Sequence, residues 1–113
     1  MKQLKTPKLK YKFLKKENDL NKVIKDQRRS GKKTYLLFIS LWDKLSASLV
    51  DKVTETYNED EGKFPLYIID SYNMPHSFVI YKTTKVPQLV ILNRNSIYSD
   101  DYLSNIYDNL GLR

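Results

Sequence analysis

The sequence predicts an α/β protein in which helices cover both faces of one mixed sheet. Three apolar runs, at residues 34–40, 65–70 and 88–92, are typical of strands covered on both faces. Strands separated by helices pair in parallel through crossovers, whereas strands joined by a short turn pair antiparallel. The length of 113 residues allows one domain of this kind and is too short for two with full cores.

The chain is predicted to begin with a basic arm and an early strand. Residues 1–10 are polar and aperiodic, which is typical of a loose arm that precedes the domain at 11–113. A short strand is expected at 11–14. No repeat and no Gly/Ser-rich or Pro-rich linker divides the remainder, so we expect a single domain.

Two amphipathic helices are expected next. Asn18 is predicted to cap the first, and Gly31 to follow its end. We expect one face of this helix to comprise Leu20, Val23, Ile24 and Gln27. The apolar residues of the second helix recur every four positions and are Leu45, Leu49, Val53 and Tyr57.

The C-terminal part is predicted to be a crossover, a hairpin and a last helix. A weaker helix or irregular crossover is expected at 74–84, and the polar turn at 93–95 leads from the third apolar run into a short strand at 96–98. The last helix is expected to start at Ser99 and stop at Gly111, with Asp100 and Asp101 favourable to its N-terminal dipole. Its predicted buried residues are Tyr102, Leu103, Ile106, Tyr107 and Leu110.

Composition excludes several classes of site. The chain has no cysteine, which excludes disulfides, thiol nucleophiles and thiolate metal sites. His76 is the single histidine and has no second imidazole to share a metal with, so a surface or helix-capping role is expected for it. We predict no metal and no cofactor.

The longest apolar runs fall far short of the ~20 residues of a membrane span, and no secretory signal pattern is present, so a cytoplasmic location is expected.

Positive charge is concentrated in the N-terminal third. The net charge is +7, and the first 33 residues hold thirteen of the twenty Lys and Arg side chains against three acidic ones. Such polarity suits an anionic partner such as nucleic acid, or a solvated basic surface. Tyr11 and Phe13 alternate with lysines, a pattern that fits either single-strand binding or an edge strand protected from pairing. The candidate nucleic-acid-binding residues are Lys8, Lys10, Lys12, Lys15, Lys16, Arg28, Arg29, Lys32 and Lys33.

The order of elements and three short motifs resemble the thioredoxin family. The segment 38–42, Phe-Ile-Ser-Leu-Trp, is similar to the strand end and tryptophan that precede the family's Cys-Gly-Pro-Cys motif. Val86-Pro87-Gln88 is similar to its hydrophobic-Pro-Thr segment, whose proline is cis, and the spacing between Trp42 and Pro87 matches. Asn-Arg-Asn at 93–95 stands where the family has its Lys-Asn-Gly hairpin. The resemblance covers residues 11–110 and implies a thioredoxin-like three-layer α/β/α fold with a central mixed sheet.

The departures from the family bear on activity. Asp43 and Ser46 stand at the two thiol positions, and Leu37 replaces the family's buried aspartate. Thiol–disulfide exchange needs an attacking thiolate and a resolving thiol, so we expect a protein that is redox-inactive and not an enzyme. Asp43 fits an N-cap of the second helix. The alternative, a hydrolytic Asp/Ser pair, lacks a base beside Ser46.

Peptide binding is the family activity that needs no cysteine. The resemblance implies that the backbone of Val86 pairs with an extended client peptide by strand addition. Trp42 is then either a core residue or an exposed anchor. We predict a protein-binding module, an inhibitor or adaptor of a host protein, whose partner-binding residues are Trp42, Asp43, Lys44, Ser46, Val86 and Pro87. Scarce alanine with abundant Asn, Lys, Ile and Tyr is typical of AT-rich coding, as in a low-GC bacterium or its bacteriophage.

Overall fold

The structure is a computed structural model that describes residues 10–59, 64–83 and 85–112. Its five strands form one sheet in the order β1-β3-β2-β4-β5. β1, β3 and β2 are mutually parallel, whereas β4 runs antiparallel to both β2 and β5. The mixed sheet predicted from the sequence is therefore confirmed. The strands are β1 (Tyr11–Leu14), β2 (Thr34–Ile39), β3 (Leu66–Asp70), β4 (Gln88–Asn93) and β5 (Ser96–Asp100).

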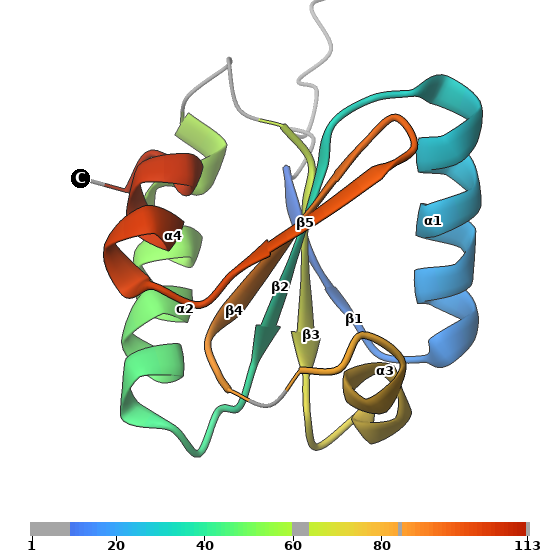
Figure 1. Ribbon diagram of the computed structural model, residues 1–113. Coiled ribbons are helices and arrows are strands. Elements are labelled where there is room, and N and C mark those ends of the chain that lie inside the picture. The colour runs from blue at the N-terminus through green and yellow to red at the C-terminus, as the bar shows by residue number, and fades with distance from the viewer. Residues whose placement is uncertain (1–9, 60–63, 84, 113) are drawn as a thin grey trace, which may run out of the picture.

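Helices cover both faces of the sheet. Figure 1 shows α1 (Glu17–Ser30) and α3 (Pro75–Ile80) on one face, and α2 (Lys44–Thr56) and α4 (Leu103–Leu110) on the other. A 3₁₀ turn, η1 (Tyr57–Glu59), continues α2. The central strand β2 is buried at every position.

The side chains of β2 alternate between two hydrophobic cores because successive residues of a strand point to opposite faces. Leu36 and Phe38 belong to the core beneath α1 and α3. Leu37 and Ile39 belong to the core beneath α2 and α4, with Leu49, Val53 and Ile106. The continuous apolar run in the sequence is thus explained by coverage on both faces.

The start of α1 differs from the prediction. Asn18 is not the cap: the helix begins at Glu17 after Lys16, whose side chain makes no capping bond. The Glu17 carboxylate instead accepts a hydrogen bond of 2.6 Å from the Ser77 hydroxyl of α3. This tertiary contact ties the first turn of α1 to α3, and the sequence near Asn18 gives no sign of it. The predicted end is confirmed, because Gly31 has φ +69° just after the helix.

The hairpin and the last helix also differ from the prediction. Ser99 and Asp100 do not start a helix; they pair with Val90 and Leu89 as the end of β5. The antiparallel ladder with β4 extends the strand, so that α4 begins only at Leu103. Tyr102 consequently lies before the helix and is exposed instead of buried. Ile106 and Leu110 are buried as predicted, and Gly111 follows the helix with φ +64°.

The buried face of α2 does not include Leu45, contrary to the prediction. Leu49, Val53 and Tyr57 are buried as predicted, but Leu45 is 54% exposed. A strict four-residue period drifts around a helix of 3.6 residues per turn. The buried stripe therefore shifts to include Ser46, and Leu45 moves to the outer surface.

The two ends of the sheet gather different segments. The carboxyl ends of β2 and β3 lie at one end with the start of β4, because Phe38 pairs with Gln88. We call this the Trp42 end. The carboxyl end of α1 and the β4–β5 turn lie at the other (Figure 1), which we call the Arg94 end.

Candidate functional site

The loop between β2 and α2 is held by three polar contacts. The Asp43 carboxylate accepts a hydrogen bond of 2.9 Å from the Ser46 backbone N–H, which confirms Asp43 as the N-cap of α2. The Ser46 hydroxyl oxygen accepts from the Ser40 N–H at 3.3 Å, and the Asp70 carboxylate accepts from the Leu41 N–H at 3.3 Å. Ser46 and Asp70 are both buried. These contacts fix the loop from its two flanking elements and from β3.

The same loop exposes apolar side chains. Trp42 is 86% exposed, so it is an exposed side chain and not a core residue. Leu41 is 51% exposed beside it, and Tyr72, in the loop after β3, is 77% exposed. Large apolar side chains that gather at one exposed site are typical of interaction surfaces. Together with Leu45, they give the Trp42 end an apolar surface.

The Val86–Pro87 peptide lies at the same end and is cis, as the resemblance implied. Pro87 is buried, and Val86 is half-buried. Because Phe38 pairs with Gln88, the residues just before Gln88 lie next to the loop that follows β2. Within the part of the chain that the structure describes, neither the N–H nor the carbonyl of Val86 has a hydrogen-bond partner.

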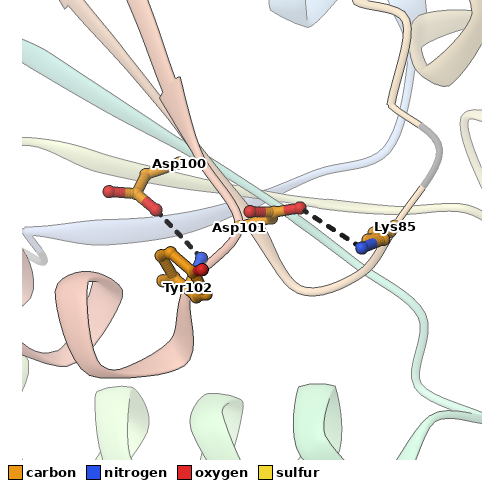
Figure 2. Close-up of polar contacts among 4 residues, drawn as sticks. All are labelled: Lys85, Asp100, Asp101 and Tyr102. Atoms are coloured by element: carbon orange, nitrogen blue, oxygen red, sulfur yellow. Dashed lines mark hydrogen bonds and ion pairs between the residues drawn. The ribbon is translucent and has the colours of Figure 1, made fainter.

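Figure 2 shows polar contacts of Lys85, which precedes Val86, and of the connection between β5 and α4. The Lys85 ammonium lies 4.0 Å from the Asp101 carboxylate and links the cis-proline loop to the connection between β5 and α4. Both side chains are solvent-exposed, so this ion pair contributes little stability. The Asp100 carboxylate accepts from the Tyr102 N–H at 2.9 Å and from the Asn105 amide at 2.9 Å. Asp100 therefore links the end of β5 to the residue before α4 and to the Asn105 side chain of its first turn.

The predicted partner-binding residues play unequal parts. Trp42 and Lys44 are exposed, and Asp43 and Val86 are half-buried. Ser46 and Pro87 are buried, so they shape the surface without presenting a side chain to it. Sequence reasoning missed Leu41, Leu45 and Tyr72. A 3.6-residue period would have placed Leu45 outside the buried stripe, but nothing in the sequence near Tyr72 indicates its neighbours.

The chain has no cysteine, so it has no residue that could perform thiol chemistry. Asp43 and Ser46 hold each other across the first turn of α2, and Leu37 is fully buried in the core. His76 is exposed at the start of α3. Across residues 10–59, 64–83 and 85–112, no three potential metal-ligating side chains of His, Cys, Asp or Glu come together. In the same ranges, none of the helices has the length and apolar character required to cross a membrane.

The candidate nucleic-acid-binding residues do not form one patch. Lys15 and Lys16 precede α1, whereas the basic group at 28–33 lies at its far end, about 21 Å away for fourteen residues. Lys12 is exposed on β1. β1 is an edge strand of the sheet, which was one of the two interpretations of the alternating aromatic and lysine residues. The Lys33 ammonium lies 5.2 Å from the centre of the Phe64 ring, so it is engaged in a cation–π contact. Lys8 is outside the described residues.

Solved structures of thioredoxins share this architecture. The germline-specific thioredoxin Deadhead of Drosophila melanogaster is 18% identical, with a TM-score of 0.70 over 88% of this chain and 96% of that one. The fold is thioredoxin-like. The thioredoxin of Fasciola hepatica gives 0.72 at 16% identity, over 88% of this chain and 95% of that one. That of Schistosoma mansoni gives 0.73 at 12% identity, over 89% and 95%. No protein-family model and no curated protein sequence matches the chain.

Proposed function

We propose that this thioredoxin-like protein binds an extended segment of a partner protein at the Trp42 end and performs no redox chemistry. One observation carries the proposal: the Val86 backbone, which has no hydrogen-bond partner among the described residues, lies at the same end of the sheet as the exposed Trp42 side chain. An extended peptide that pairs with Val86 gains backbone hydrogen bonds, which supply affinity without a cysteine. An exposed tryptophan supplies an anchor for its side chains.

The rigidity of the loop supports this role. The contacts from Asp43, Ser46 and Asp70 hold the loop before any partner arrives. A preorganised surface loses less conformational entropy on binding. With no group at thiol positions 43 and 46 that can transfer electrons, a bound partner stays chemically unchanged. That outcome fits an inhibitor or adaptor of a host protein better than an enzyme.

The test begins with peptides selected from a displayed random library against the whole chain. For a selected peptide, Trp42→Ala should weaken binding by roughly 2 kcal/mol or more, the range of an interface hot spot. The free energy of unfolding should change by less than about 0.5 kcal/mol, because the side chain is 86% exposed. Tyr98→Ala is the matched control, an exposed aromatic residue on β5.

Two further changes examine the backbone of the site. Methylation of alternate amide nitrogens in the peptide should abolish binding, since strand addition uses its N–H groups. Val86→Asp should weaken binding from the protein side. The proposal is wrong if the methylated peptide binds as well as the parent. It is equally contradicted if Trp42→Ala and Tyr98→Ala weaken binding alike.

A second candidate function is nucleic-acid association through the basic N-terminal third. Exposed Arg28, Arg29 and Lys32 at the end of α1 favour it. Affinity for single strands should then fall with salt, with a log–log slope of about −0.7 per phosphate neutralised. Charge reversal at Lys12, Lys15, Arg28 and Arg29 should abolish binding. Capture of a bacterial protein that persists after nuclease treatment, together with weak and length-independent DNA binding, would contradict it.

A further inference from the structure

A cavity of about 360 Å³ lies at the Arg94 end, remote from the Trp42 surface. Its walls come from α1, from the residue after α3, and from the β4–β5 hairpin. Figure 1 shows the tip of this hairpin beside the carboxyl end of α1. Such a volume is at the lower end of the range for small-ligand sites.

Two arginine residues from different elements line this cavity. Arg28 is on the last turn of α1, and Arg94 is in the β4–β5 turn. Neither is paired with a carboxylate anywhere in the described segments. The Arg94 side chain passes over the end of α1, since its Cγ would lie 3.9 Å from a Cβ placed on Gly31. Paired guanidiniums match the oxygens of a phosphate group through bidentate hydrogen bonds.

A partly buried hydrogen bond joins two walls of the cavity. The Gln27 amide Nε2 donates to the Arg94 carbonyl oxygen at 3.0 Å, and Gln27 is only 4% exposed. Arg94 itself has φ +56°, an uncommon conformation for a residue other than glycine. The bond from Gln27 therefore fastens a strained turn to α1. The backbone of Arg94 is therefore held at the cavity before a ligand binds.

The remainder of the wall is aromatic and apolar. Tyr81 lines the cavity, and its ring packs against Phe38 with centroids 5.4 Å apart. Burial raises the pKa of the Tyr81 phenol, and the positive charge of Arg28, which also lines the cavity, opposes that rise. Ile24, Leu92 and Ile97 add apolar surface. A nucleobase binds well where an aromatic ring or a guanidinium plane is available for stacking.

We propose that this cavity binds a nucleoside 5′-monophosphate, with the phosphate between Arg28 and Arg94 and the base toward Tyr81. The arginines supply the charge for the phosphate, and the apolar wall gives the nucleoside a contact that inorganic phosphate lacks. The same chemistry is present at a 5′-phosphorylated end of a nucleic-acid strand. Of these two sources we choose the free nucleotide, because a volume of about 360 Å³ is typical of a site for one small ligand.

The experiment titrates the whole chain with adenosine monophosphate, adenosine and inorganic phosphate, and follows backbone amide NMR signals. Signals of the β4–β5 turn and the last turn of α1 should move and saturate with the nucleotide. Arg28→Gln and Arg94→Asn should each weaken binding about tenfold or more, the effect of losing charge-assisted hydrogen bonds. Asn is chosen at position 94 because it tolerates positive φ. Thermal unfolding of each variant checks that it is folded.

Arg29→Gln is the matched control, because it removes the same charge from the same turn of α1 without lining the cavity. It should change the affinity less than about twofold, as expected of a screened surface charge. Equal losses for Arg28→Gln and Arg29→Gln would overturn the proposal in favour of general charge attraction. Phosphate that binds as tightly as the nucleotide would overturn the assignment of the base. A 5′-phosphorylated oligonucleotide that binds while the nucleotide does not would transfer the site to nucleic acid.

Discussion

The Trp42 end of the sheet carries exposed apolar side chains and a Val86 backbone that has no hydrogen-bond partner among the described residues. The Arg94 end instead carries a cavity lined by Arg28 and Arg94, neither of which pairs with a carboxylate in the described segments. Each end is fixed by a buried polar side chain. Asp70 holds the Leu41 N–H at the first, and Gln27 holds the Arg94 carbonyl at the second. One small sheet can thus present two separate surfaces, of which we propose one for an extended peptide and the other for an anion.

The absence of redox activity at the Trp42 end is the largest expected effect. The protein should not reduce insulin disulfides with any reductant, because Asp43 and Ser46 supply neither attacking nor resolving thiol. Turnover by the pure protein in the standard turbidity assay would contradict this.

The double substitution Asp43→Cys/Ser46→Cys places cysteines at both positions where thioredoxins have their thiols. It should give only slow activity, because Leu37 offers no proton acceptor and is fully buried. A rate equal to that of a thioredoxin would show that the buried aspartate of the family is dispensable here. Nucleotide binding at the Arg94 end should be unchanged in this double variant.

A smaller effect is expected for stability at the Arg94 end. Gln27→Ala removes the buried donor to the Arg94 carbonyl and should lower the free energy of unfolding by about 1–3 kcal/mol. Urea denaturation measures the change. Lys25→Ala, an exposed position of α1, is the control and should shift it by less than about 0.5 kcal/mol. A loss no greater than that of the control would mean that the bond does not hold the turn.

The smallest effect is a decline of stability in alkaline solution. Burial raises the Tyr81 pKa above its ordinary value of about 10, and burial with the nearby Asp26 charge raises the Tyr67 pKa. The unfolded chain therefore loses these protons at lower pH than the folded one, so stability falls as pH rises beyond about 10.

Chemical unfolding across this pH range measures the decline. Tyr81→Phe should make it shallower, whereas Tyr98→Phe, at an exposed position, serves as the control. Arg28→Gln should raise the Tyr81 pKa further, since the arginine charge favours the phenolate. An unchanged slope in Tyr81→Phe would contradict the prediction. A lower Tyr81 pKa in Arg28→Gln would exclude contact between the two across the cavity.

Local sequence determined most of the fold. The apolar runs specified β2, β3 and β4 because burial on both faces leaves no polar alternation. Gly31 and Gly111 marked the ends of α1 and α4 because both adopt positive φ. Asp43 marked the start of α2 because a short carboxylate can bond the free N–H groups of a first turn. Trp42 and Pro87 were identified from their spacing and their similarity to thioredoxins.

The tertiary structure decided the features that depend on contacts between residues far apart in the sequence. The start of α1 follows from the Glu17–Ser77 bond, and the length of β5 follows from pairing with β4. Tyr72 joins the Trp42 surface only because the carboxyl ends of β2 and β3 lie side by side. The cavity between Arg28 and Arg94 arises where residues 67 positions apart, Gln27 and Arg94, bond across two elements. Composition and periodicity report only the near neighbours of a residue, so sites assembled by topology are outside their reach.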